Sequence, residues 1–205
     1  MTAASYDAVA AAYAASLGDE LRAKPLDRAL LAAFGELAGP GPIADLGSGP
    51  AHLTRRLGRR AVALDLSPEM ARVARYHPFV TGSMLSLPFR DGVLAGVLAC
   101  YSIIHFDRPG RRRAFAEMAR VLRPGGVALI AFHVDAAEAA AGTSLHLTEH
   151  FGAVVDLTFH FLDPASVTAD LEAAGLPVTA TTVREPIPGA EFPSRRAYLL
   201  AAAGG

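Results

Sequence analysis

The residues best suited to chemistry follow a short apolar run, in the stretch IADLGSGPAH at positions 43–52. Asp45 stands two residues before Gly47, and a single residue separates Gly47 from Gly49. A glycine turn between a parallel strand and a helix lets backbone N–H groups approach a ligand closely. The spacing differs from the dinucleotide fingerprint G-x-G-x-x-G, because its third glycine would fall at His52. A carboxylate at this strand tip favours a ligand with a positive end.

A second acid, Asp65, ends the next predicted strand twenty positions after Asp45. A carboxylate at that place can accept both hydroxyls of a ribose. The ligand should therefore carry a ribose, a cationic end and a part that tolerates close backbone contact. S-adenosylmethionine has all three, as an adenosine, a sulfonium and an amino-acid head.

Four segments resemble, in chain order, the motifs of the class I S-adenosylmethionine-dependent methyltransferases. DLGSGPA resembles the first motif, VALDLSPEM the acidic second, GSMLSLPF the third, and VLRPGGVALIAF the stretch before the fifth strand. They lie within residues 42–133, and YDAVAAAYA near the N-terminus is similar to the small type-11 branch of this family. The resemblance implies a Rossmann-like fold, S-adenosylmethionine as cofactor and S-adenosylhomocysteine as product.

The resemblance also implies a set of cofactor-binding residues: Asp45, Gly47, Ser48, Gly49, Asp65, Leu66, Ser83, Met84, Tyr101 and Tyr13. Asp45 would organise the loop and the methionine amino group, and Asp65 would hold the ribose. Leu66 and Met84 would lie on either side of the adenine. The alternative is that Asp45 and Asp65 only cap neighbouring helices.

Two positions depart from the family pattern. Ala51 stands where the first motif has a third glycine, and we expect a small local shift because alanine is the mildest replacement. Ser83 stands where the third motif has an acid that meets the adenine amino group. A hydroxyl can accept that hydrogen bond without charge assistance, so the departures should affect cofactor affinity rather than the fold.

Tyr101 and His105 follow the fourth predicted strand, at the carboxyl edge of the sheet where such folds bind ligands. Tyr101 would contact the acceptor or the carboxylate of the cofactor. His105 is a candidate general base, since its ordinary pKa lies near neutrality, or else it caps a short helix. His133, at the end of the fifth predicted strand, is the second catalytic candidate.

Residues nearer the two ends of the chain complete the predicted site. The residues expected to contact the acceptor are Tyr6, Tyr101, His105 and His160. His133 and His160 line the acceptor pocket or are surface histidines. Tyr6 and Tyr13 would fold over the cofactor as a lid, or else they pack in the core.

Two other patterns point to different chemistry. HLTEH at 146–150 matches an inverted zinc-protease signature, with both histidines on one face if the segment is helical. A catalytic zinc needs a third ligand and supporting groups, so no metal site is predicted. RRR at 111–113 opens a predicted helix without interleaved aromatic residues, which is typical of a solvated face rather than a nucleic-acid patch.

The elements that must position these residues alternate between strand and helix, which predicts a parallel, doubly wound α/β sheet. We expect helices at 5–16 and 25–38, separated by Gly18 and Pro25, and further helices at 51–58, from Pro68 after a Ser67 cap, at 111–123 and at 164–175. Strands are expected at 43–46, 59–66, 78–83, 92–101, 126–134, 177–187 and 196–203. The predicted architecture is a seven-stranded, mostly parallel sheet with an antiparallel last strand.

Residues 135–162 interrupt the alternation and are predicted to form an inserted cap. Within it, apolar Val155, Leu157, Phe159 and Phe161 alternate with polar Asp156, Thr158 and His160, as in a strand with one polar face. We expect one domain, with an N-terminal helical lid at 1–38, a cofactor-binding core at 42–133, the cap, and a C-terminal helix and strands at 163–205.

Composition limits the other classes of function. The chain has 205 residues, is 52% hydrophobic and carries a net charge of −1, so it can form a sizeable core without a general attraction to nucleic acid or anionic membranes. Cys100 is the single cysteine, which excludes an intrachain disulfide. No basic n-region opens the chain and no apolar run reaches the ~20 residues that span a bilayer, so we expect a soluble cytoplasmic protein.

The expected function is methyl transfer to an O, N or C atom of a small-molecule acceptor in specialised metabolism, by in-line displacement. Because the donor is already activated, the protein mainly aligns the reactants and excludes water. The expected partner is a small molecule, not a nucleic acid or a membrane. The alternatives are a cofactor-binding scaffold, a non-methyl reaction on the same fold, and an RNA or protein methyltransferase.

Overall fold

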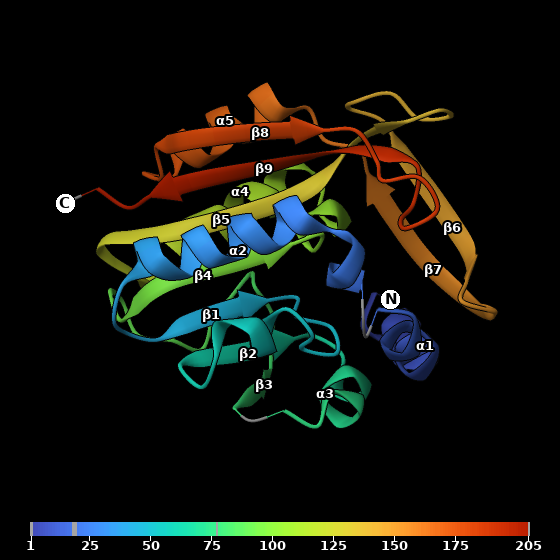
Figure 1. Cartoon of the computed structure of the whole chain (residues 1–205), viewed down its shortest axis with the longest axis horizontal. Coiled ribbons are helices and arrows are strands. Elements are labelled where there is room, and N and C mark those ends of the chain that lie inside the picture. The colour runs from blue at the N-terminus through green and yellow to red at the C-terminus, as the bar shows by residue number, and fades with distance from the viewer. Residues whose placement is uncertain (1, 18–19, 77, 205) are drawn as a thin grey trace.

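A seven-stranded sheet forms the centre of the computed structural model, which describes residues 2–17, 20–76 and 78–204 (Figure 1). The order is β3-β2-β1-β4-β5-β9-β8. The strands are β1 (Ile43–Leu46), β2 (Ala61–Asp65), β3 (Phe79–Thr81), β4 (Leu94–Cys100), β5 (Leu122–Ala136), β8 (Val178–Arg184) and β9 (Ser194–Ala202). Strands β3, β2, β1, β4 and β5 pair in parallel, and β9 is antiparallel to both β5 and β8. The predicted topology, including the antiparallel last strand, is confirmed.

Helices cover both faces of this sheet (Figure 1). They are α1 (Thr2–Leu17), α2 (Pro25–Ala38), α3 (Pro68–Ala74), α4 (Arg108–Val121) and α5 (Pro164–Ala173), with short 3-10 turns η1 (Glu20–Ala23), η2 (Thr54–Leu57) and η3 (Ile103–His105). Phe34 of α2 packs on one face, while Phe115 of α4 and Leu171 of α5 pack on the other. Both faces of β4 are therefore buried, which explains its unbroken apolar run. Gly18 lies outside the described residues.

Local signals set the helix boundaries. Ser67 caps α3, its Oγ accepting a hydrogen bond from the Met70 backbone N–H at 3.1 Å, and Asp163 caps α5. The helix predicted at 51–58 is wrong, since only the four-residue 3-10 turn η2 forms there. Ala51 takes a left-handed φ of 58°, so a regular helix cannot begin until after it, and Gly58 ends the segment. At the other side, α4 gives way directly to β5 at Leu122, before Pro124.

The insert folds as a hairpin of β6 (Ser144–His150) and β7 (Ala153–His160), which lies beside α1 at the end of the sheet (Figure 1). Val155 and Leu157 are buried against Val9 of α1, so the predicted alternation along this strand is confirmed. The Ser5 Oγ also accepts a hydrogen bond from the Asp156 backbone N–H at 2.9 Å. Helix α1 and the hairpin therefore form one covering layer over this edge of the sheet.

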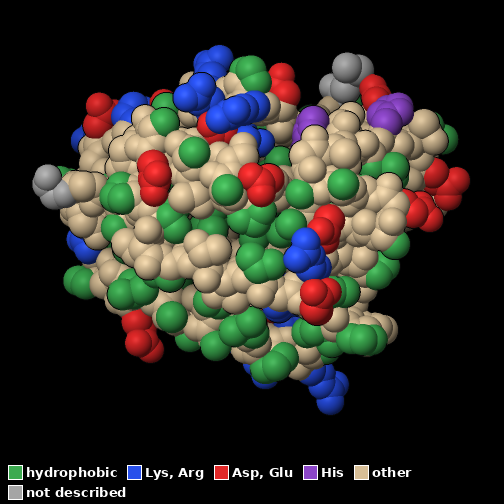
Figure 2. All heavy atoms as spheres, turned by 90° about the horizontal axis from the view of Figure 1, so that it is seen from above, with side chains coloured by type: hydrophobic (Ala, Val, Ile, Leu, Met, Phe, Trp, Pro, Cys, Tyr) green, Lys and Arg blue, Asp and Glu red, His purple; other side chains and the backbone are tan. Residues whose placement is uncertain are grey.

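Polar surface features differ from the predictions in one respect. Arg111 is not on a solvated face: it is 5% exposed and pairs with buried Asp170 at 2.7 Å, whereas Arg112 and Arg113 are exposed. On the face shown in Figure 2, Lys and Arg side chains gather toward one edge, and charges of both signs are scattered elsewhere.

The HLTEH segment lies on strand β6 rather than on a helix, and His146 pairs with Asp156 at 2.8 Å. Within residues 2–17, 20–76 and 78–204, no group of three or more His, Cys, Asp or Glu side chains is arranged to hold a metal ion. In the same residues, no helix is long and apolar enough to cross a membrane.

Candidate functional site

The glycine turn after β1 brings its backbone against the end of the neighbouring strand. Gly47 and Gly49 have positive φ angles of 68° and 51°, a region that glycine adopts without steric cost. A Cβ at position 47 would collide with the side chain of Ser102, so this position has no room for another residue. The Gly49 N–H donates a hydrogen bond to Asp65 Oδ2 at 2.8 Å. The turn and the acid predicted from separate motifs therefore lie in direct contact.

Asp65 is held in a fixed orientation at this contact. Its Oδ1 accepts a hydrogen bond from the Ser67 backbone N–H at 2.9 Å. Burial raises the pKa of the carboxyl, while the N–H groups of Ser67 and Gly49 favour its ionised form. Each carboxylate oxygen of Asp65 thus accepts one hydrogen bond from a backbone N–H, and each can accept another from a ligand.

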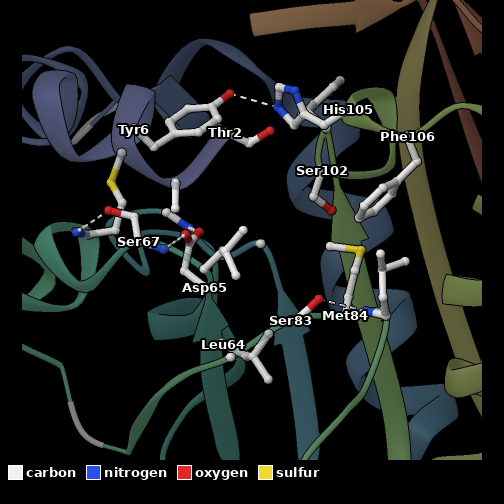
Figure 3. A pocket seen from close by; sticks show the side chains of 18 of the residues that line it. Thr2, Tyr6, Leu64, Asp65, Ser67, Ser83, Met84, Ser102, His105 and Phe106 are labelled. Atoms are coloured by element: carbon white, nitrogen blue, oxygen red, sulfur yellow. Dashed lines mark hydrogen bonds between the residues drawn. The ribbon is translucent and has the colours of Figure 1, made fainter. Parts of the chain in front are cut away.

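Asp65 opens onto a cavity that we call the first chamber, lined by α1 and by the loops after β1, β2, β3 and β4 (Figure 3). The predicted residues that line it are Tyr6, Tyr13, Gly47, Gly49, Asp65, Leu66, Ser83, Met84, Tyr101 and His105. Leu66 is 46% exposed and Met84 is buried. The Ser83 Oγ already accepts a hydrogen bond from the Leu85 N–H at 3.1 Å, so one lone pair of this hydroxyl is used within the protein.

Tyr6 and His105 close one side of the first chamber. The Tyr6 hydroxyl and His105 Nε2 are 2.8 Å apart, and Figure 3 shows the two side chains pointing at one another. Burial lowers the pKa of His105 to about 4, so its imidazole is neutral at physiological pH. The contact joins the covering helix α1 to the segment after β4. His105 therefore lines the first chamber and is bonded to Tyr6 of helix α1.

A second, larger cavity continues from the glycine turn, and we call it the second chamber. Its volume is ≈ 750 Å³, against ≈ 170 Å³ for the first. Gly47, Gly49, Tyr13, Cys100 and Tyr101 line both, so the two chambers join there.

Asp45 and Ser48 line the second chamber only. Asp45 is 1% exposed, and its Oδ2 accepts a hydrogen bond from the Thr54 hydroxyl at 2.6 Å. Burial raises the pKa of Asp45 to about 6.

The wall of the second chamber contains a buried ionic network that the sequence analysis missed. Lys24 lies between Glu20 at 2.5 Å and Glu191 at 3.5 Å, and Glu20 also meets His52 at 2.5 Å. Glu191 in turn pairs with Arg196 at 3.1 Å. These residues come from η1 and the residue after it, from the turn after β1, from the connection between β8 and β9, and from β9 itself. The one available signal was that Lys24 is the only lysine in the chain.

Tyr101 lines both chambers, and its hydroxyl is bonded within the protein. Its hydroxyl is bonded to that of Tyr198 at 2.8 Å, and Tyr198 donates to Asp27 Oδ1 at 2.7 Å. The hydroxyl is thus committed to a chain of hydrogen bonds within the protein, which leaves the ring to face the chambers. Tyr101 also has a φ of 55°, an uncommon conformation for a large residue.

The two remaining histidines occupy different places. His133 lines the second chamber, where its Nδ1 is 2.6 Å from the Ser194 Oγ and its ring lies 5.0 Å from that of Tyr101. Burial, with the nearby charge of Arg196, lowers the pKa of His133 to about 3. His160 is half-buried near the end of β7 and lines neither chamber, so the structure does not bring it to the site.

Residues 43–126 match the family model described as "Methyltransferase domain". A malonyl-[acyl-carrier protein] O-methyltransferase of Serratia marcescens is 33% identical over 136 residues, which cover 60% of this chain and 51% of the relative. A demethylmenaquinone methyltransferase of Mycobacterium bovis is 39% identical over 98 residues, 45% of this chain and 41% of the relative. The chain thus spans about half, or less, of the length of the curated relatives it matches.

Solved structures share the fold at lower identity. A 1,6-didemethyltoxoflavin-N1-methyltransferase of Burkholderia thailandensis, with bound 1,6-didemethyltoxoflavin and S-adenosylhomocysteine, superposes with a TM-score of 0.67 at 23% identity, covering 91% of this chain and 80% of its own. A SAM-dependent methyltransferase of Methanosarcina mazei gives 0.67 at 16% identity, covering 80% and 92%. Residues 43–126 thus resemble a methyltransferase domain, and the chain as a whole shares the fold of these solved methyltransferases.

Proposed function

We propose that this protein binds S-adenosylmethionine across the two chambers and transfers its methyl group to a small-molecule acceptor. The observation that carries the proposal is the contact between the Asp65 carboxylate and the Gly49 N–H, at the point where the chambers join. This contact places Asp65, as a carboxylate for the ribose, next to the glycine turn, whose backbone can approach the methionyl part closely.

The residues present fit this cofactor. In the first chamber, Leu66 and Met84 offer apolar surfaces for an adenine, and Asp65 offers a carboxylate for the ribose hydroxyls. In the second chamber, Asp45 offers a carboxylate for the methionyl ammonium. With a pKa of about 6, Asp45 is ionised at neutral pH and can make that ion pair.

When bound, S-adenosylmethionine supplies a methyl group already activated by a positively charged sulfur. The chain then has to align the acceptor with that methyl group and to keep water away. Helix α1 covers the first chamber and is backed by the β6–β7 hairpin, and the bond between Tyr6 and His105 joins α1 to the segment after β4. Neither His105 nor His133 needs to be ionised for these tasks.

The relatives support a small acceptor. The enzymes named above are described as acting on a demethylmenaquinone and a didemethyltoxoflavin, both small molecules, and one on a malonyl group carried by a protein. We propose an O, N or C atom of a small molecule as the methyl acceptor, in specialised metabolism. The buried basic side chains near the glycine turn, Lys24 and Arg196, are paired in the ionic network of the second chamber, so they do not form an open basic groove for a nucleic acid.

The alternative is a protein of this fold with another task. A neighbour at TM-score 0.65 and 16% identity is described as a [4+2]-cyclase. In this chain, the committed hydroxyl of Ser83 and the left-handed Ala51 are the features that favour weakened cofactor binding. A scaffold or a non-methyl catalyst would bind the cofactor without consuming it.

Calorimetric titration with S-adenosylmethionine and S-adenosylhomocysteine tests the proposal. We expect micromolar binding, lost by about 100-fold in Asp65→Ala, since a charge-assisted contact contributes about 1.5–3 kcal/mol. Glu69→Ala is the matched control, because Glu69 is an exposed acid on the adjacent helix α3 and should leave affinity unchanged. Absence of binding at millimolar ligand would contradict the proposal, and binding without methyl transfer to any acceptor tried would favour the alternative.

A further inference from the structure

We propose that the acceptor is an uncharged, planar aromatic molecule bound at one end of the second chamber, between Phe192, Phe151 and the ring of His133. This rests on the function proposed above, since it assigns the part of the second chamber that the cofactor leaves open. Four side chains define what we call the aromatic end: Tyr101, His133, Phe151 and Phe192.

The location follows from the sizes and positions of the chambers. The first chamber is narrow and is closed on one side by Tyr6 and His105, so an adenosine would fill it. The second chamber is more than four times larger (≈ 750 against ≈ 170 Å³), which exceeds the need of an amino-acid head. That head belongs beside Asp45 and the glycine turn, so the aromatic end remains for another molecule.

The aromatic end is built for a flat apolar ligand. The His133 ring packs 5.0 Å from that of Tyr101 and 6.0 Å from that of Phe192, and the Phe151 ring packs 5.4 Å from that of Tyr13. Phe151 and Phe192 nonetheless remain 40% and 52% exposed. They belong to two separate segments, the β6–β7 turn and the β8–β9 connection. Large exposed aromatic rings converging on one cavity are typical of a ligand site.

The charges of the chamber wall argue against an ionic acceptor. Lys24 is paired with Glu20 and Glu191, His52 with Glu20, and Arg196 with Glu191. Arg196 also donates to the backbone carbonyls of Ser194 at 2.7 Å and Phe192 at 3.0 Å. Arg22 is the remaining cation of the lining and is exposed, where solvent screens it. A charged ligand would have to give up its hydration here without gaining an unpaired partner.

His133 supplies a polar contact at the aromatic end. Its Nδ1 is taken by Ser194, and its Nε2 makes no hydrogen bond to another described residue. This nitrogen can hold a hydroxyl or N–H of the acceptor and so position the nucleophilic atom. In the transfer, the bond from that atom to the methyl carbon forms while the carbon–sulfur bond breaks, leaving a neutral thioether. The proton of the acceptor is released to solvent, to which this end of the chamber is exposed at Phe151 and Phe192.

Three ligands of one shape and different charge test this inference: 2-naphthol, 2-naphthoate and 2-naphthylmethylammonium. Each is titrated into the full-length protein with and without saturating S-adenosylhomocysteine, by calorimetry and by naphthol fluorescence, which is readable because the chain has no tryptophan. We expect 2-naphthol to bind at least tenfold more tightly than either ion at pH 7.5. Equal or tighter binding of an ion, or no binding of 2-naphthol at millimolar concentration, would overturn the inference.

Matched variants locate the ligand. Phe192→Ala should weaken 2-naphthol binding about tenfold or more, while Leu37→Ala, a similarly exposed apolar residue on α2, should leave it unchanged. His133→Asn keeps a polar group near Ser194 but removes Nε2, and should weaken 2-naphthol severalfold without altering the affinity for S-adenosylhomocysteine. Equal effects of Phe192→Ala and Leu37→Ala would place the ligand elsewhere and overturn the inference.

The two proposals fail in different ways. If the natural protein does not bind S-adenosylhomocysteine, the proposed function is contradicted. The naphthol titrations without that ligand still test whether an aromatic molecule binds at the aromatic end. A different result contradicts only the inference about the acceptor. In that case the natural protein binds S-adenosylhomocysteine, Asp65→Ala abolishes this binding, and an ionic naphthalene binds more tightly than 2-naphthol.

Discussion

The two chambers of the site are built in opposite ways. The first is smaller, and its carboxylate, Asp65, is held by backbone N–H groups of the turns after β1 and β2, those of Gly49 and Ser67. The second is wide, and its wall joins charges from distant segments, with Lys24 and Glu191 separated by most of the chain. The first chamber depends on strand order, and the second depends on long-range ion pairs.

This difference matches two tasks. A cofactor that is the same throughout a family needs a chamber fixed by the sheet and its turns. An acceptor that differs between enzymes is better held by segments outside the sheet, such as the β8–β9 connection, which can change without altering the fold. Disrupting the ionic wall of the second chamber should therefore affect stability, and disrupting its aromatic end should affect acceptor binding, whereas disrupting the first chamber should affect the adenosine of the cofactor.

The largest expected effect is on the ionic wall of the second chamber. Glu191→Gln should lower the free energy of unfolding by about 3–5 kcal/mol, because it leaves Arg196 and Lys24 buried without their shared carboxylate. Denaturant unfolding at pH 7.5 measures this, with exposed Glu172→Gln as the control. A decrease in the free energy of unfolding of less than about 1 kcal/mol would show that the ionic network does not stabilise this part of the fold.

The same substitution has a defined pH dependence. Burial opposes ionisation of Glu191, but its bond to Arg184 and the charge of Arg196 outweigh burial and lower its pKa to about 2. A lowered pKa stabilises the fold above the ordinary value, and this contribution is lost as pH falls toward the folded pKa. The natural protein and Glu191→Gln should therefore converge in stability between pH 4.5 and 2.

The next effect concerns Asp45, which lines the second chamber beside the glycine turn. Burial raises its pKa from 3.8 to about 6, so its ionisation destabilises the ligand-free fold as pH rises through that range. Asp45→Asn should therefore stabilise the ligand-free protein at pH 7.5 by up to about 3 kcal/mol, the value of a shift of this size. The variant should also bind S-adenosylhomocysteine more weakly, because the partner of the ammonium is lost.

Thermal unfolding across pH 4–8 and calorimetry measure the two effects of Asp45→Asn. Asp135→Asn serves as control, since Asp135 is more exposed and paired with Arg195. Equal stability of Asp45→Asn and the natural protein at every pH would contradict the assignment of a buried, costly carboxylate.

A smaller effect is expected from the lid over the first chamber. Tyr6→Phe removes the 2.8 Å hydrogen bond to His105 and should weaken cofactor binding by about 1 kcal/mol, or about fivefold. Because the pKa of His105 is about 4, this difference should stay constant from pH 5 to 8. Tyr76→Phe is the control, since the hydroxyl of Tyr76 bonds to Ala61 outside both chambers. Equal cofactor affinities for Tyr6→Phe and Tyr76→Phe would show that the hydrogen bond between Tyr6 and His105 does not contribute to cofactor binding.

The smallest effect is local to the glycine turn. Ala51 has a left-handed φ of 58°, which costs an alanine about 1–2 kcal/mol and a glycine almost nothing. Ala51→Gly should raise the free energy of unfolding by about 0.5–1 kcal/mol after the lost methyl contacts are counted. Ala63→Gly, in the same buried cluster but on strand β2, should lower it. If both substitutions destabilise the protein, the packing of the Ala51 methyl group contributes more to stability than relief of its backbone conformation.

The first chamber was predictable from sequence because its parts lie in short motifs that the parallel strands bring to one edge. Asp65 and Gly49 illustrate this: Asp65 ends β2 and Gly49 lies in the turn after β1, and the pairing of these two strands places them in contact. The length of η2 was not predictable, since the left-handed conformation of Ala51 depends on its packing against Ala63 and Ala74.

The second chamber was largely hidden in the sequence. A buried Lys24 looks like any surface lysine until the β8–β9 connection folds over it, and Arg111 looked solvated until Asp170 of α5 was placed beside it. Long-range ion pairs leave no periodic pattern along a chain, in contrast to strands and helix caps. His160 shows the reverse error, since its place on the polar side of a predicted strand did not bring it to the site.

The most direct test of the account is a crystal structure of the protein with S-adenosylhomocysteine and 2-naphthol. The account predicts the ribose hydroxyls on Asp65, the adenine between Leu66 and Met84, the methionyl end beside Asp45, and the naphthol between Phe192 and His133. An adenine in the second chamber, or a naphthol beside Tyr6 and His105 in the first, would contradict the placement of the adenosine in the first chamber and of the acceptor at the aromatic end of the second.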